Sequence, residues 1–583
     1  MKSLSALIPY LKKYRTKILW GYVFILGHIT LFSLYPLVIG DAIDKLSSGI
    51  YGAPVYTDIA IAIAMVGVAG VFLFLTRQHI IVMSREVEND LRYDFFSHLQ
   101  KLERNFFNKV TTGDLMARAT SDINNVRNFV GPGVMYSMQT FTRLVITLYI
   151  LFDINAVITL IALVPLPLIS LFVYRIGRYT FKRSLKVQES FSDLTTRVQE
   201  TFSGIRVLKT FVREKYEFEE FDKISKDNLA KNLKLAIIQS FSFPMMFLLT
   251  GVSIILVLYF GGIKYMNGEL TIGNISEFIM YLGQLTWPMI AFGWIINLFQ
   301  RAAPSMQRLM NITEREPVIK NDSGTNKNIG ANNIKGGIEF KNVSFKYPDT
   351  DKFVLKNINL KVPTGTTLGI IGHTGSGKST LINLLPRVYD ISEGEIIIDD
   401  YNLQNIPVKS LRDAIGIVPQ ESFLFSATIE KNISYSSDKA NIEKVIEAAK
   451  IADLYKDITN FPYEFHTILG ERGITLSGGQ KQRTSLARAI YKEPKILILD
   501  DSLSAVDTNT EEQILNELKT VMKGRTNIII SHRISSIKNA TNIIVLKNGE
   551  ISEQGTHSEL LALRGYYFDL YQKQLLEEEI EKS

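Results

Sequence analysis

The chain has 583 residues, enough for several domains of ordinary size. It contains no cysteine, which excludes disulfides, thiolate metal sites and a cysteine nucleophile. Its formal net charge is +7, but the basic residues do not gather in one tract, so we expect no nucleic-acid partner. The start, MKSLSALIPYLKKYRTK, lacks a small-residue cleavage site, and no removable signal peptide is predicted.

Long apolar blocks fill the first half of the chain, each near the roughly 20 residues that cross a bilayer. They cover residues 18–40, 56–75, 134–152, 156–174, 237–260 and 277–299. One block alone would fit a buried helix of a soluble protein, but the series predicts a multi-pass domain in the cytoplasmic membrane. Lys and Arg concentrate before the first block and in segments 76–133 and 175–236, so both termini are predicted to face the cytoplasm.

Segments 76–133 and 175–236 are too long and too regular to be loops. Apolar residues repeat at helical spacing, for example Val87, Leu91, Phe95 and Leu99. We expect each segment to form a hairpin of helices projecting from the membrane. The hairpin turns are predicted near residues 111–126 and 212–223.

A linker rich in Gly, Asn and Ser follows, DSGTNKNIGANNIKGG at residues 322–337. We therefore predict a transmembrane domain at 1–311, a linker at 312–336 and a soluble α/β domain at 337–583.

The soluble part contains a glycine-rich loop in the context that binds phosphates. A predicted strand at Thr367–Ile371 precedes GHTGSGKST, and a helical pattern follows. Glycines let backbone N–H groups turn toward phosphate oxygens, and the helix N-terminus adds positive charge. Lys378 would bridge the β- and γ-phosphates, and the Ser379 hydroxyl would bind Mg²⁺. The predicted ATP-binding residues of this loop are Gly372, His373, Thr374, Gly375, Ser376, Gly377, Lys378, Ser379 and Thr380.

Further polar residues follow apolar runs typical of buried strands. Asp500 ends ILILD and would hold Mg²⁺ through water, while Gln420 follows a short strand and could reach the metal and the attacking water. His532 follows the strand 527–530, where an imidazole could contact the γ-phosphate. Ser477 is a good N-cap for a helix ending near Tyr491, and its glycines expose amides to an anion.

The ordered motifs GHTGSGKST, VPQ, LSGGQ, ILILDD, SAVD and SHR resemble the nucleotide-binding domain of ATP-binding cassette (ABC) transporters. The layout is similar, over essentially the whole chain, to half-size exporters of the multidrug and lipid-flippase type. The resemblance implies an all-α transmembrane domain of six helices with long cytoplasmic extensions, followed by an α/β P-loop ATPase domain. It also implies ATP and Mg²⁺ as cofactors and a second half-transporter as partner.

The same resemblance implies roles for individual residues. Tyr347 sits where an aromatic ring stacks on adenine, and the extension tips would dock on the cassettes. Gln420, Asp501 and His532 occupy the positions of catalytic residues. The signature residues, which would contact ATP held by the opposite cassette, are Leu476, Ser477, Gly478, Gly479 and Gln480. Ser504 and Asp507 would lie in the loop at the dimer interface.

One position departs from the family pattern. Asp501 stands where the family usually has the glutamate that polarises the attacking water. The shorter side chain retracts the carboxylate, and a misplacement of about 1 Å can cost on the order of 100-fold in rate. Exporters with two different halves often carry this change in one half. Because LSGGQ is intact here, we favour a heterodimer; the alternative is a homodimer in which Asp501 still works.

The cargo is less clearly encoded than the ATPase. Candidate cargo-facing residues are Arg143, Met245, Met280, Trp287 and Trp294. Methionine and aromatic side chains form adaptable apolar surfaces, although they also serve as ordinary lipid-facing or packing residues. Arg143 lies near mid-bilayer, where it would bind anionic drugs or lipid headgroups or would form a structural pair. Export of lipophilic compounds is the favoured function, and a lipid flippase is the alternative.

Overall fold

The computed structural model describes residues 2–321, 325–326, 328–470, 476–504, 506 and 508–582. It describes the backbone alone at residues 2, 166–170, 173–174, 242–243, 246, 289–290, 508–509 and 578–582. The chain divides into two units, each described by itself. The first is Met1–Gln100 with Thr111–Arg315, and the second is Lys101–Val110 with Glu316–Ser583.

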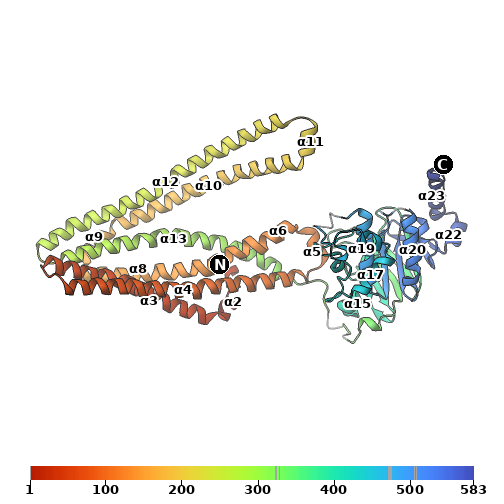
Figure 1. Cartoon of the computed structure of the whole chain (residues 1–583), viewed down its shortest axis with the longest axis horizontal. Helices are drawn as coiled ribbons and strands as arrows, with labels where there is room; N and C mark the ends of the chain where they lie inside the picture. Colours follow the sequence, from red (N-terminus) through yellow and green to blue (C-terminus); the bar gives the residue numbers. More distant parts are fainter. Residues whose placement is uncertain are drawn as a thin grey trace. The chain divides into compact units, whose positions relative to one another are not determined.

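The first unit is a bundle of long helices (Figure 1). Its helices are α1 (Lys2–Ser5), α2 (Ile8–Lys13), α3 (Arg15–Ser47), α4 (Ala53–Leu99), α6 (Thr112–Ala117), α7 (Ile123–Asn128), α8 (Val134–Ile154), α9 (Ala156–Leu163), α10 (Pro165–Ser203), α11 (Ile205–Thr210), α12 (Glu214–Met266) and α13 (Ile272–Thr313). Two π-helical turns, η1 (Arg118–Asp122) and η2 (Phe129–Gly133), connect α6, α7 and α8 into one nearly continuous helix.

Five helical stretches of the described residues are long and apolar enough to cross a membrane. They are Arg15–Ser47, Ala53–Leu99, Thr112–Ile154, Phe247–Met266 and Ile272–Thr313. Each overlaps one predicted span. The remaining predicted span, 156–174, covers α9 and the start of α10, where several side chains lie outside the described residues.

The hairpin turns lie earlier in the chain than predicted. The first turn is at residues 100–111. Thr111 is the N-cap of α6, and its hydroxyl accepts a hydrogen bond from the Asp114 N–H, so a new helix begins where the turn was predicted to start. The second lies between α10 and α12, around α11, and residues 214–223 already belong to α12. Polar composition marks both tips only approximately, since the same residue types begin helices.

The second unit has two sheets. The six-stranded sheet has the order β10-β9-β3-β8-β7-β6, and the four-stranded sheet has the order β2-β1-β4-β5. The strands are β1 (Ile338–Phe345), β2 (Leu355–Val362), β3 (Thr367–Gly372), β4 (Glu393–Ile398), β5 (Tyr401–Asn402), β6 (Ile415–Val418), β7 (Ile496–Asp500), β8 (Thr526–Ile530), β9 (Asn542–Lys547) and β10 (Glu550–Gly555).

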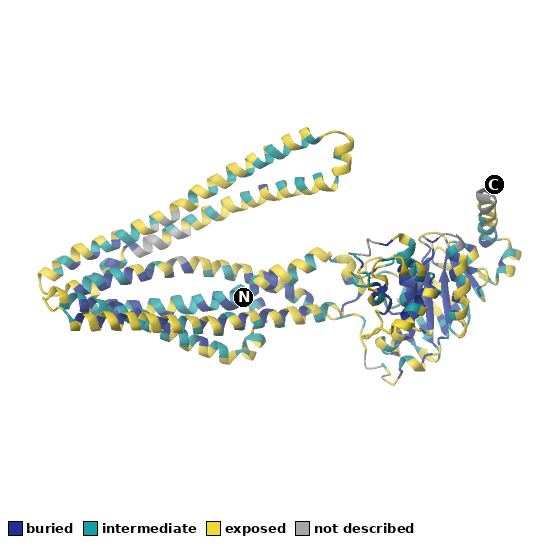
Figure 2. Ribbon diagram, viewed as in Figure 1, coloured by how far each residue is buried: buried dark blue, intermediate teal, exposed yellow. Residues whose placement is uncertain are grey.

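The strands of the larger sheet form the buried centre of this unit (Figure 2). The helices of the unit are α5 (Arg104–Lys109), α14 (Lys378–Leu384), α15 (Val408–Ala414), α16 (Ile429–Ile433), α17 (Ile442–Ile451), α18 (Tyr455–Thr459), α19 (Gly478–Tyr491), α20 (Thr508–Met522), α21 (Ile534–Ile537), α22 (His557–Leu563) and α23 (Tyr566–Lys582). Strands β6, β7, β8 and β3 are parallel, so their carboxyl ends share one edge, where ligands bind in α/β sheets.

The first hairpin tip belongs to this second unit. Phe106 of α5 is buried, the Lys109 ammonium lies 2.5 Å from an Asp349 carboxylate oxygen, and Asn108 donates to the Tyr389 hydroxyl at 3.3 Å. A segment between two membrane helices is thus packed on the cassette of its own chain.

Candidate nucleotide site

The predicted phosphate loop joins β3 to α14, as the strand–glycine–helix pattern indicated. Gly375 and Gly377 have φ values of +79° and +103°, which favour glycine and turn the backbone N–H groups into the loop. Lys378 is buried, and its ammonium donates to the carbonyls of Gly372 at 2.8 Å and His373 at 3.0 Å.

The loop also holds an unpartnered hydroxyl. Ser376 is 5% exposed, and its Oγ has no hydrogen-bond partner among the described residues. A buried hydroxyl without a partner is costly, and phosphate oxygens would satisfy it. The loop is therefore suited to an anion on grounds independent of its glycines.

Asp500 ends β7 beside this loop. Its Oδ1 accepts a hydrogen bond from the Ser379 hydroxyl at 3.3 Å. Burial raises the pKa of the Asp500 carboxyl, and the neighbouring Asp501 adds to the rise. Burial also lowers the pKa of the Lys378 ammonium, against the attraction of these two carboxylates. Hydroxyl and carboxylate oxygens are ligands that Mg²⁺ prefers, so this pair fits the metal.

Residues at or just after the ends of β6, β7 and β8, residues of the phosphate loop and α14, and Val354 before β2 line one cavity of about 260 Å³. Its lining is Val354, Thr374, Gly375, Gly377, Lys378, Ser379, Thr380, Gln420, Asp500, Asp501, Ile530 and His532. The structure thus brings Gln420, Asp501 and His532, far apart in the sequence, to the phosphate loop. Their convergence follows from the parallel order β3-β8-β7-β6.

Asp501 has an unusual backbone for a side chain that is not glycine. Its φ is +46°, in the left-handed region that aspartate tolerates better than most residues. Its N–H donates to the Ile530 carbonyl at 2.9 Å, and its carbonyl accepts from the Ser504 hydroxyl at 3.0 Å. The Gln482 side chain, on α19, donates to the same hydroxyl at 3.2 Å, which joins Asp501 to the signature helix.

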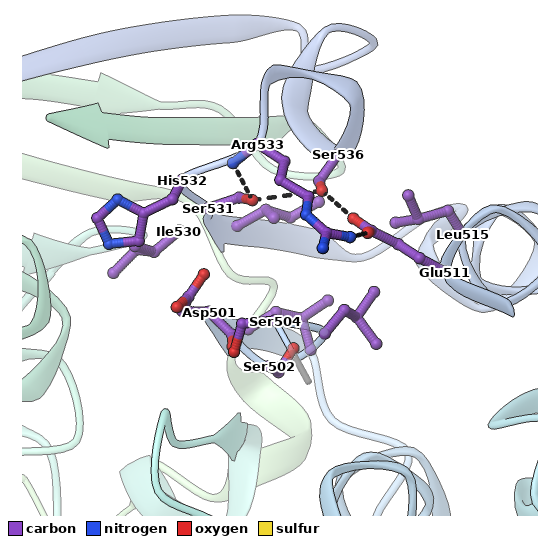
Figure 3. Close-up of a pocket in the computed structure, with 13 residues that line it drawn as sticks. Asp501, Ser502, Ser504, Glu511, Leu515, Ile530, Ser531, His532, Arg533 and Ser536 are labelled. Carbon is purple, nitrogen blue, oxygen red and sulfur yellow. Dashed lines mark hydrogen bonds and ion pairs between the residues drawn. The ribbon is translucent and has the colours of Figure 1, made fainter. Parts of the chain in front are cut away.

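Beside Asp501 and His532 lies a second cavity, of about 90 Å³ (Figure 3). Arg533 forms an ion pair with Glu511, which is 4% exposed, and the Ser536 hydroxyl donates to the other oxygen of this carboxylate at 2.5 Å. Sequence reasoning missed Glu511 and Gln482. Both residues lie shortly after a motif, Gln482 after LSGGQ and Glu511 after SAVD, but closeness in sequence does not show which side chain turns toward the site.

The signature residues begin α19 as predicted. Ser477 is its N-cap, and its hydroxyl and the Gln480 side chain exchange hydrogen bonds with each other's backbone N–H groups. Leu476 is buried, Ser477 and Gly478 are exposed, and none of these residues lines the phosphate cavity. Asp507 lies outside the described residues.

Comparison with known proteins decides the family. Residues 18–289 match the model of the ABC transporter transmembrane region, and residues 355–504 match the ABC transporter model. The chain is 36% identical to the multidrug resistance-like ATP-binding protein MdlA of Buchnera aphidicola subsp. Schizaphis graminum, covering 94% of each chain.

The chain belongs to the ABC transporter family. It is also 35% identical to an ATP-dependent lipid A-core flippase of Syntrophus aciditrophicus, over 85% of this chain and 82% of the flippase. A solved structure of a bacterial Atm1-family ABC exporter with ATP bound matches 96% of this chain and 99% of its own, with a TM-score of 0.78 and 26% identity. The protein is therefore an ATP-binding, multi-pass membrane transporter that hydrolyses ATP to drive transport. Its half-size architecture implies that it works as a dimer.

Tyr347 of this transporter lies beside the phosphate-loop helix. Its hydroxyl is 3.0 Å from the Thr380 hydroxyl, and its ring packs edge to face on Phe345 and Tyr389. Tyr389 also accepts the hydrogen bond from Asn108 of α5. The predicted adenine platform is thus connected through one tyrosine to the first hairpin tip.

The candidate cargo residues lie on three helices of the transporter. Arg143, on α8, is half-buried and lies over the Phe32 ring of α3, with its guanidinium carbon 5.2 Å from the ring centre. Trp294, on α13, packs edge to face on Tyr136 at 5.2 Å. Trp287 and Met280 also lie on α13, and Met245 lies on α12; Trp287 is exposed and the two methionines are half-buried.

Proposed function

We propose that this transporter uses ATP to export lipophilic compounds across the cytoplasmic membrane. The observation that carries the proposal is the phosphate loop with Asp500, Gln420 and His532 around one cavity, on a chain whose other half is a helical membrane domain. Relatives named for multidrug resistance support a drug-like cargo. The relative named as a lipid A-core flippase supports the alternative, movement of a lipid.

We assign roles to the residues of the cavity on the basis of their chemistry. Lys378 and the loop N–H groups would neutralise the phosphate charge in a site poor in water. Ser379, Asp500 and Gln420 would hold Mg²⁺, which supplies positive charge to the β- and γ-phosphates. Tyr347 would stack on adenine, and His532 would donate to the γ-phosphate. Asp501 would accept the hydrogen bond of the attacking water, from a retracted position.

We propose a heterodimer, with a homodimer as the alternative. Ser477 and Gly478 are exposed at the start of α19 and have no part in the cavity of their own chain, which fits contact with ATP held by a second chain. Asp501 lacks the methylene that the usual glutamate has. A partner with glutamate at this position would then contain the faster of two sites.

The second hairpin tip supports dimerisation on separate grounds. The tip around α11 carries exposed apolar side chains, among them Phe211 at 71% and Val212 at 79% (Figure 2). We propose that it docks on the cassette of the second chain, with both termini and both cassettes in the cytoplasm. The proposed domain boundaries remain 1–311, 312–336 and 337–583.

Arg143 and the apolar candidates are proposed to face the cargo. A guanidinium near mid-bilayer costs roughly 2.5–3.5 kcal/mol on insertion scales, so it requires a polar or aromatic partner or a cavity. The Phe32 ring supplies part of this stabilisation and would leave the N–H groups available to an anionic group. A purely structural pairing with Phe32 is the alternative.

The test uses the native protein in vesicles of defined lipid. We expect lipophilic drugs to stimulate ATP hydrolysis in vesicles of a single zwitterionic lipid, with anionic drugs losing their stimulation in Arg143→Gln and neutral drugs keeping it. Stimulation only by added lipid would establish the flippase alternative. Purification of the native protein alone, without a second chain bearing the glutamate, would contradict the heterodimer.

A further inference from the structure

The last helix, α23, is firmly held to the cassette at its start. The Glu553 carboxylate accepts hydrogen bonds from the backbone N–H groups of Tyr566 at 2.6 Å and Tyr567 at 3.1 Å. Tyr567 is fully buried, and its hydroxyl is 2.7 Å from Nδ1 of His557. The first turn therefore cannot move without breaking buried contacts.

This fixed turn contacts the phosphate loop. The Tyr566 ring packs on the His373 ring with centroids 4.6 Å apart. His373 is the second residue of GHTGSGKST, and its carbonyl accepts from the Lys378 ammonium at 3.0 Å. His373 thus connects the start of α23 to Lys378, the lysine that would bind the phosphates.

About two turns later, the same helix contacts the loop of His532. The Gln574 amide nitrogen donates to the His532 carbonyl at 2.7 Å, and its amide oxygen accepts from the Ile534 N–H at 2.9 Å. Ile534 begins α21, so its N–H is one of the donors that a helix start leaves without an internal partner. A single side chain therefore holds the backbone on both sides of Arg533.

The opposite side of the His532 loop is also held. Arg533 pairs with the buried Glu511, and the Arg533 N–H donates to the Ser531 hydroxyl at 2.9 Å (Figure 3). Glu511 fixes the Arg533 side chain, whereas Gln574 fixes the peptide that carries His532. The direction of the imidazole depends on that peptide.

We propose that Gln574 is a positioning residue for His532: from a helix whose start packs on the phosphate loop, its two hydrogen bonds hold the peptide that orients the imidazole. Gln574 lies eight positions after Tyr566 on α23, about 12 Å along the helix axis. The pairing of β3 with β8 fixes the spacing of the two loops, and Gln574 of α23 holds the His532 peptide within that frame. The inference rests on the proposed role of His532.

ADP lacks the γ-phosphate that His532 would contact. A comparison of ADP with an ATP analogue therefore isolates the contribution of this contact to nucleotide binding. We would label this chain with photoactivated 8-azido-ATP in its native complex, and compete with ADP or with the non-hydrolysable analogue AMP-PNP. Gln574→Met removes both hydrogen bonds but keeps the length of the side chain. We expect AMP-PNP to compete about 3-fold to 10-fold less well in this variant, and ADP to compete as in the wild type.

The matched control is Gln572→Met, an exposed residue of the same helix, which should change neither competition. His532→Ala should weaken AMP-PNP selectively by about 10-fold, and adding Gln574→Met should cause no further loss, since both act through one contact. Equal loss of both nucleotides in Gln574→Met, no loss, or additive losses in the double variant would overturn the inference. A His532→Ala variant that does not discriminate the nucleotides would disprove the proposed role of His532, and this inference with it.

Discussion

The cassette has two regions that we propose to contact nucleotide, and they differ in how complete each one is within a single chain. The phosphate-loop region gathers Lys378, Asp500 and His532 around one cavity within a single chain. The signature region, at the start of α19, is capped by its own Ser477 and Gln480 and has exposed residues outside that cavity. The first region is built by the parallel sheet. In the proposed dimer, the second region would contact nucleotide held by another chain, and catalysis would then depend on the dimer.

The two regions also differ in how closely they match the motifs of the family. LSGGQ is intact, while the proposed catalytic position holds Asp501, whose φ is +46° and whose side chain is one methylene shorter than that of glutamate. In a heterodimer, the intact signature of this chain would complete the faster site, at the phosphate loop of the partner. The phosphate loop and Asp501 of this chain would form the slower site. Changes in the two regions should then have unequal effects.

The largest effect is expected in the signature region. Ser477→Ala combined with Gly478→Glu should reduce total ATPase activity by about 100-fold or more, because a side chain and a negative charge would enter the γ-phosphate site of the partner. The measurement is steady-state ATP hydrolysis of the co-expressed complex in matched membranes. Lys481→Ala, just beyond the signature on α19, is the control and should retain most activity.

The next effect tests the phosphate loop itself. Lys378→Ala should abolish most ATP hydrolysis and transport, because the phosphates lose their main counter-charge and ATP bound at this loop would be needed to close both sites, even where its own turnover is slow. Lys378→Arg keeps the charge but not the geometry, and should recover little. Normal turnover of Lys378→Ala, with the partner's loop also blocked, would refute the assignment of this loop.

A smaller effect is expected at the adenine side of the same region. Tyr347→Ala should weaken nucleotide binding at this chain by about 2-fold to 10-fold, and Tyr347→Trp should largely preserve it, because an aromatic ring is what stacks on the base. Photolabelling of this chain with increasing nucleotide gives the affinity. Equal affinities of wild type and Tyr347→Ala would remove this residue from the site.

The smallest effect is the sharpest test of asymmetry. Asp501→Asn should lower total ATPase activity less than about twofold in a heterodimer, because this site contributes little turnover. Asp501→Glu should raise the contribution of this site. A homodimer predicts instead that Asp501→Asn is as inactive as the signature variant. That result, in the same ATPase assay, would exclude the heterodimer.

Much of this protein could be predicted from sequence because its signals are local. The strand before Gly372, the N-cap Ser477 and the buried strand ending at Asp500 all appeared where the residues indicated. Backbone φ preferences, caps and apolar runs act over a few residues, so their positions can be read directly along the chain. The strand, glycine-rich turn and helix of the phosphate loop were predictable for this reason.

Contacts between distant segments were decided only by the tertiary structure. Three such contacts join residues 22 to 193 positions apart: Glu511 with Arg533, Gln574 with the His532 peptide, and Tyr566 with His373. No rule of sequence spacing predicts them. The first hairpin turn was misplaced because Thr111 caps a new helix, and the second because residues 214–223 already belong to α12. Sequence alone determined the chemical groups of the site and their order along the chain. Packing determined which side chains hold them, because those neighbours are selected by sheet order and helix direction in three dimensions.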